Sequence, residues 1–76
     1  MEVEKIEITT EYIALGQFLK LANIIESGGM AKLFLADYDV FVNNEQDQRR
    51  GRKLYPGDRV DIPDVGSFEI HVEESM

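Results

Sequence analysis

The chain has 76 residues, enough for one small domain, and 43% of them are hydrophobic, which is too many for a disordered tail. It contains no cysteine, so disulfides and thiolate chemistry are excluded. Its formal net charge of −7, from 8 basic and 15 acidic side chains, argues weakly against nucleic acid as a partner. The segment MEVEKIEITTEY has no apolar core of signal-peptide length, and no stretch is long enough for a membrane span. We therefore expect one cytoplasmic domain over residues 1–76.

The first expected elements are a strand and a helix. In VEKIEIT, residues 3–9, Ile6 and Ile8 alternate with charged residues, which predicts a strand. ALGQFLKLANI, residues 14–24, carries apolar residues at the spacing of one helical stripe: Leu15, Phe18, Leu19 and Ala22. Gly16 lies inside this pattern, where glycine costs about 1 kcal/mol relative to alanine. It therefore indicates either a helix start or a close approach by another backbone.

A second helix is expected in ESGGMAKLFLADY, residues 26–38. Ser27 is a good N-cap, because its hydroxyl can accept a hydrogen bond from a free amide of the first turn. The helix is apolar over most of its circumference, so we expect it to be largely buried. The residues that make it apolar are Met30, Ala31, Leu33, Phe34 and Leu35.

Lys32 is the only charged residue between Glu26 and Asp37. Gly28 and Gly29 have no side chains to cover the free amides of the first turn. Bare amides with a lysine one turn later make a fair phosphate site. The alternative is that the glycines let the chain turn between the helices, while Lys32 solvates an otherwise apolar element.

The remaining segments predict turns and short strands. VFVN, residues 40–43, reads as a strand that Asn43 and Asn44 can turn, and YPGD fits a turn centred on Pro56 and Gly57. RVDIP and SFEIHVE then alternate, with these inner-face residues: Val60, Ile62, Phe68, Ile70 and Val72. The predicted fold is an α+β domain, two adjacent helices on a small, mostly antiparallel sheet. Its expected core contains Leu15, Phe18, Leu19, Phe34, Leu35, Val42, Val60 and Ile62.

Half of the positive charge falls in five consecutive positions of DQRRGRKLYPGD: Arg49, Arg50, Arg52 and Lys53. Residues 12–57 carry six basic and five acidic side chains, whereas the two ends carry two basic and ten acidic ones. Because exposed charges are screened beyond about 8 Å, such a cluster attracts an anion if folding turns the acidic ends away. Arginine forks fit phosphate, and Tyr55 offers a stacking face. A salt-bridged surface arm is the alternative, although such pairs contribute only about 0–1 kcal/mol.

Two other constellations are weak. Glu69, His71 and Glu73 alternate on one strand face and could hold a metal, but this pattern is also that of a solvated edge strand. A catalytic arrangement of Ser27 or Ser67 with His71 has no support in the spacing. We therefore predict no metal, no cofactor and no catalytic residue.

The order of these features resembles the alpha-L RNA-binding domain, a module shared with small-subunit ribosomal protein S-four, pseudouridine synthases and tyrosyl-tRNA synthetases. The resemblance covers residues 15–62, about two-thirds of the chain, and places the alpha-L core at about residues 14–62. It rests on a leucine-rich first helix, a serine before a second helix with a basic residue, a V-x-V-N strand and turn, a basic segment and L-x-x-G-D-x-V. The matching residues are Leu15, Phe18, Leu19, Ser27, Ala31, Lys32, Val40, Val42, Asn43, Leu54, Gly57, Asp58 and Val60.

LGQFLKLA, SGGMAK and RRGRKLYPGD look most like the short stand-alone bacterial members, which are encoded beside replication-initiation genes and linked to large-subunit biogenesis. Two positions depart from the family pattern. Gly28 stands where many members have arginine, which removes a phosphate contact, and Asn44 stands where many have glycine.

The resemblance implies an RNA-binding face formed by both helices and a basic hairpin arm. We expect a non-catalytic module for structured RNA, ribosomal RNA in ribosome assembly, acting as a monomer without a small-molecule substrate. The alternative is a protein-interaction module whose Arg49–Lys53 arm docks on an acidic partner. The expected RNA-binding residues are Gln17, Lys20, Asn23, Ser27, Gly28, Gly29, Lys32, Arg49, Arg50, Arg52, Lys53 and Tyr55.

Overall fold

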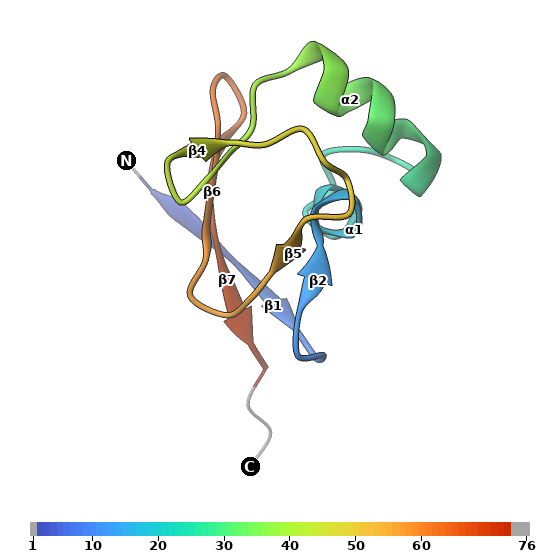
Figure 1. The fold of residues 1–76 in the computed structure, drawn as a ribbon. Helices are drawn as coiled ribbons and strands as arrows, with labels where there is room; N and C mark the ends of the chain where they lie inside the picture. Colours follow the sequence, from blue (N-terminus) through green and yellow to red (C-terminus); the bar gives the residue numbers. More distant parts are fainter. Residues whose placement is uncertain (1, 74–76) are drawn as a thin grey trace.

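The computed structural model describes residues 2–73, which form two short helices, one 3-10 turn and seven strands (Figure 1). In chain order the elements are β1 (Val3–Ile8), β2 (Ile13–Ala14), α1 (Leu15–Leu21), η1 (Gly28–Met30), α2 (Ala31–Asp37), β3 (Phe41–Val42), β4 (Glu45–Gln46), β5 (Lys53–Leu54), β6 (Arg59–Ile62) and β7 (Gly66–Val72). Within this part of the chain neither helix is long and apolar enough to cross a membrane.

Five strands make the main sheet, in the order β1-β7-β6-β3-β4. Strand β1 runs parallel to β7, and every other pair in this sheet is antiparallel. A separate two-stranded antiparallel ladder joins β2 to β5. Helix α1 packs close to the strands, and α2 lies at one end of the molecule (Figure 1). The α+β prediction, with two adjacent helices on a mostly antiparallel sheet, is confirmed.

The core lies between the helices and one face of the sheet. Alternation along the strands puts Ile6 and Ile8 of β1 on this face, opposite Ile70 and Val72 of β7 in the parallel register. Phe18 of α1 is fully buried, and its ring meets that of Phe68 edge to face, with centroids 5.4 Å apart. All the predicted core residues are buried except Phe34, which is half-buried.

Val72 keeps the predicted inner-face position, in register with the buried Ile8 of β1, but it is not buried, since 46% of the residue is exposed. The alternation itself holds, because Phe68 and Ile70 of the same strand are buried. Val72 is the last residue of β7, and its exposure shows that the covered part of the sheet ends before this position.

The prediction of a largely buried second helix is wrong. In α2 only Ala31 and Leu35 are buried, whereas Leu33 is 68% exposed and Met30, just before the helix, is 44% exposed. The helix lies at the edge of the fold (Figure 1). Ala31 and Leu35, four residues apart, face the core with Phe34 half-buried beside them, whereas Lys32 and Leu33 face water.

The predicted turns have the expected backbone geometry. Asn43 and Asn44 both have positive φ, 51° and 71°, as a two-residue hairpin between β3 and β4 requires. Gly57 has a φ of 96°, and the amide of Asp58 donates to the carbonyl of Tyr55 at 2.9 Å. This turn sends the chain from β5 into β6.

Candidate nucleic-acid interface

The basic loop, which we define as residues 47–53, is tied to the start of α1 by its backbone. The amide of Leu15 donates to the carbonyl of Arg52 at 2.8 Å, and the amide of Gly16 donates to that of Arg50 at 2.9 Å. Ala14, the N-cap residue, has no side-chain cap, so the loop carbonyls satisfy amides that a helix start leaves free. The cluster therefore lies on a docked loop and not on an extended arm.

Gly16 is where the loop and the two helices meet. A Cβ atom at this position would lie 3.3 Å from the Cβ atoms of both Ala31 and Arg50. Any side chain here would force these neighbours to shift by a few tenths of an ångström, and the predicted close contact with another backbone is confirmed by the hydrogen bond to the Arg50 carbonyl. Lys32 directly follows Ala31, so Arg50 and Lys32 belong to segments that come together here.

Asp47 anchors the loop from inside. Among residues 2–73 it is the only charged residue that is buried, with 7% of its surface exposed. Its Oδ1 accepts from the Arg49 backbone amide at 2.8 Å and from Arg49 Nε at 3.1 Å. Its Oδ2 accepts from Arg49 Nη2 at 2.8 Å and from Arg52 Nη1 at 2.9 Å. These donors satisfy the carboxylate and fix the conformation of the loop.

Charge and titration follow from this geometry. Hydrogen bonds from the Arg49 side chain hold the pKa of Asp47 well below its ordinary value of 3.8; burial opposes the shift, and Arg52 reinforces it. The same interaction raises the pKa of Arg49. Asp47 is therefore ionised at neutral pH and offsets one of the positive charges of the loop.

The four cations of the loop differ in how open they are. The Arg52 side chain is 26% exposed and serves mainly to hold Asp47, whereas that of Arg49 is 74% exposed despite its ion pair. A guanidinium has five N–H donors, so Arg49 can hold Asp47 and still present donors to another anion. Within residues 2–73, no carboxylate pairs with Arg50 or Lys53. The alternative of a salt-bridged surface arm thus describes Arg49 and Arg52 but not Arg50 and Lys53.

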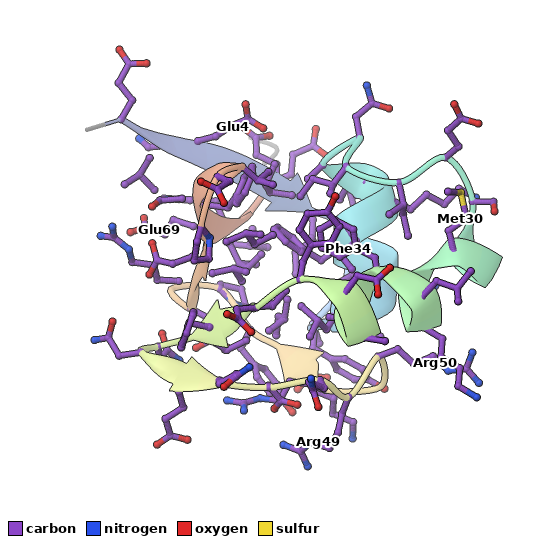
Figure 2. The ribbon with its side chains drawn as sticks, turned by 90° about the horizontal axis from the view of Figure 1, so that it is seen from above. Glu4, Met30, Phe34, Arg49, Arg50 and Glu69 are labelled. Carbon is purple, nitrogen blue, oxygen red and sulfur yellow. The ribbon has the colours of Figure 1, made fainter. Side chains whose placement is uncertain are left out.

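Glu4 and Glu69 lie away from the loop, whereas Glu45 and Asp58 line grooves beside it. Figure 2 shows Arg49 and Arg50 extending from one edge of the molecule, with Glu4 at the opposite edge and Glu69 on another side. Asp58 lies nearer the loop, but its carboxylate accepts hydrogen bonds from Asn43 Nδ2 and from the Tyr55 amide. These bonds stabilise the turn between β5 and β6. Folding therefore produces a basic edge on an acidic protein.

The other predicted residues spread away from this edge. Gln17 and Lys20 are exposed on α1 and line a shallow groove with Glu7 of β1. Asn23, beyond the end of α1, lines a groove with Glu2 and Glu4. The helix runs about 7.5 Å from Gly16 to Leu21 at 1.5 Å per residue, and Asn23 lies beyond its end, in a groove that contains no residue of the basic loop.

The start of the second helix differs from the predicted N-cap. Ser27 precedes η1, but its side chain makes no capping hydrogen bond. Gly28 and Gly29 belong to this 3-10 turn, and the α-helical part of the segment begins only at Ala31. A Cβ atom on Gly28 would meet nothing within 4 Å, so the space beside it is open.

The His71 face has local partners only. His71 Nε2 lies 2.6 Å from Glu69 Oε1, and both side chains are partly exposed. Within the described part of the chain, no three His, Asp or Glu side chains gather in a way that could hold a metal ion.

Replacing His71 with alanine is expected to leave RNA affinity within about twofold of the original value, because the residue lies on the sheet and away from the basic loop. The measurement is RNA binding together with metal analysis of both proteins. A loss of binding accompanied by loss of a stoichiometric metal would contradict this assignment.

Comparison with known proteins agrees with this geometry. A family model described as the S4 domain matches residues 6–71. The chain belongs to the S4 domain family. A relative from Bacillus subtilis (strain 168), described as "Probable ribosome maturation protein RlbA", is 63% identical over 65 residues, 86% of this chain and 92% of that protein. The S4 domain is an RNA-binding, non-catalytic module, and the resemblance seen in the sequence is confirmed.

Two features of this S4 domain were missed in the sequence. Asp47 was not singled out in the sequence, although it is the buried centre of the loop. Tyr12 was not considered, yet its ring lies 5.8 Å from that of Tyr55, and Lys53 Nζ lies 4.9 Å from its centroid. Tyr12 directly precedes Ile13, which pairs with Leu54. Only this pairing of β2 with β5 reveals the contact, and no local pattern in the sequence indicates it.

Proposed function

We propose that this S4 domain is a non-catalytic RNA-binding module for structured ribosomal RNA, acting in ribosome assembly in the bacterial cytoplasm. The observation that carries the proposal is the docking of the basic loop on the start of α1. It gathers cations at one edge, away from Glu4 and Glu69 (Figure 2). The relative described as a ribosome maturation protein supports ribosomal RNA as the ligand.

The cations of the loop suit recognition of phosphates. Arg50 is free of carboxylate partners among residues 2–73, and Arg49 is open, so both can contact the RNA backbone. Contacts to phosphates position a protein on RNA and respond to the shape of the fold more than to base sequence. Acidic groups on the other sides repel a polyanion that approaches in the wrong orientation, which favours selective binding.

The proposed contact surface combines the open cations with the neighbouring ends of the two helices. Its centre comprises Arg49, Arg50, Lys53, Tyr55, Lys32 and the open segment at Gly28 and Gly29. Gln17, Lys20 and Ser27 lie toward its margin, and Asn23 lies outside it. Arg52 acts by holding Asp47. We propose that residues 1–76 work as one domain and as a monomer.

The test is binding of purified protein to ribosomal RNA fragments as a function of salt. Each neutralised phosphate contributes about −0.7 to −0.9 to the slope of log K against log[salt], so three to five contacts give a slope of roughly −2 to −4. Replacing Arg50 and Lys32 together with alanine should flatten the slope by about 1 to 2 units and weaken different RNAs by similar factors.

The matched control removes one charge from the other side of the molecule. Lys5→Ala lies on β1, away from the loop, and should leave the slope unchanged within error. Arg52 is avoided as a probe because its replacement also disturbs Asp47. A flat or undetectable salt response of the unmodified protein would refute the RNA proposal and favour docking of the loop on an acidic protein.

A further inference from the structure

Two tyrosines lie side by side next to the basic loop, although 43 positions separate them in the sequence. Tyr12 precedes β2 and Tyr55 follows β5, and pairing of Ile13 with Leu54 brings them together. Their ring centroids are 5.8 Å apart and their planes make an angle of 46°. Leu54 points into the core and is fully buried, so the next residue, Tyr55, points outward.

Both rings remain open to solvent. Tyr12 is 41% exposed and Tyr55 is 44% exposed, so neither ring is needed to fill the core. Lys53 Nζ lies 4.9 Å from the Tyr12 centroid, within the range of a cation–π contact. Lys53 thus holds the Tyr12 ring, which in turn packs against Tyr55.

Cations lie beside Tyr55. The residue lines a shallow, open groove together with Arg49, Gly51, Arg52, Lys53 and Asp58. A Cβ atom on Gly51 would meet nothing within 4 Å, so the loop backbone is open at this point. An aromatic face beside arginine and lysine donors matches the chemistry of a nucleotide, with a flat base next to a charged phosphate.

We propose that Tyr55 stacks one unpaired base of the bound RNA, while the basic loop holds the phosphates that flank it. The inference rests on the proposed RNA-binding function and specifies what the surface recognises: a bulged or looped-out nucleotide and not a continuous duplex. Single-strand recognition commonly uses unstacked bases on aromatic rings, and such stacking tolerates any base.

The geometry assigns different roles to the two rings. A base between two parallel rings needs about 7 Å, twice the contact distance of about 3.5 Å, and these rings are closer and tilted. The base therefore stacks on the open side of Tyr55 and does not enter between the rings. Tyr12, clamped by Lys53, is a positioning residue that limits rotation of the Tyr55 ring.

The test uses two RNA hairpins with the same stem, one fully paired and one with a single bulged adenosine. The unmodified protein should bind the bulged hairpin more tightly. Tyr55→Ala should weaken binding to the bulged hairpin by at least about fivefold, the lower end for a stacked base, and change binding to the paired hairpin little. Tyr55→Phe keeps the ring and should retain the preference. Tyr12→Leu should reduce the preference in part.

The salt dependence separates stacking from a general disturbance of the loop. A lost stack removes no phosphate contact, so the slope of log K against log[salt] should be the same for Tyr55→Ala and the unmodified protein. Equal losses on both hairpins, or a flattened slope, would overturn the stacking proposal while leaving RNA binding in place. Failure of the unmodified protein to bind either hairpin or ribosomal RNA fragments would refute the proposed function itself.

Discussion

Replacing Asp47 with alanine is expected to lower the free energy of unfolding at pH 7 by about 1.5–3 kcal/mol, the range for hydrogen bonds to a charged group. The variant removes an acceptor for four donors and leaves the partly buried guanidinium of Arg52 without its partner. A chain of this length has a total stability of about 4–11 kcal/mol, so the loss is a large fraction. Urea denaturation measures it. Asp37→Ala, at an exposed aspartate, is the matched control and should stay within about 0.5 kcal/mol.

The effect of Asp47→Ala should depend on pH in a defined direction. The pKa of Asp47 is lowered in the folded state, so its contribution to stability is complete above the ordinary value of 3.8 and is lost as the pH falls below it, toward the folded-state value. The difference between the two proteins should therefore be constant from pH 7 to about pH 5 and narrow as the pH falls toward 3. A difference that grows on acidification would contradict the assigned role of Asp47.

Replacing Gly16 with leucine is expected to lower the free energy of unfolding by about 1–3 kcal/mol and to weaken RNA binding. Even a Cβ atom would lie 3.3 Å from the Cβ atoms of Ala31 and Arg50, so a larger side chain must displace α2, the basic loop or both from α1, and we expect the loop to move. Loss of the hydrogen bond from the Gly16 amide to Arg50 costs about 1 kcal/mol. The better helix propensity of leucine stabilises the helix by about the same amount as the lost hydrogen bond costs. Overpacking therefore decides whether the free energy of unfolding falls.

Thermal unfolding and salt-titrated RNA binding check this expectation together. A loss of 1 kcal/mol should lower the melting temperature by roughly 4–8 °C in a domain of this size. Gly28→Leu provides the same substitution where nothing lies within 4 Å, and should have little effect on stability. A Gly16→Leu protein that melted normally and bound RNA normally would show that the loop does not depend on its contact with α1.

The sequence was sufficient to predict the elements whose signal is local. Alternation predicted β1, β6 and β7, a helical stripe predicted α1, and Asn43 with Asn44 and Gly57 predicted turns that require positive φ. Local patterns do not report which side of a helix meets another element. For this reason Leu33 was expected inside and is mostly exposed.

In the candidate interface, too, the features with a local signal were predictable and those that depend on tertiary contacts were not. Composition identified the basic segment, but it could not separate Arg50, which is free of carboxylate partners among residues 2–73, from Arg52, which holds a buried carboxylate. That distinction depends on the position of Asp47 relative to α1. Likewise the contact of Tyr12 with Tyr55 depends on the pairing of β2 with β5, which no short motif encodes.

The parallel pairing of β1 with β7 affects how a newly made chain folds. Val3 pairs with Ser67, so 64 positions separate partners that lie side by side. At a synthesis rate of about 5–20 residues per second, β1 waits roughly 3–13 s for its partner to be made. During this time it is an unpaired strand, the kind of segment on which other chains can add. Its three charged residues, Glu4, Lys5 and Glu7, put charge on the exposed segment and oppose such addition. The charged residues of β1 thus oppose aggregation of the nascent chain. Only after folding can they contribute to selective binding of RNA.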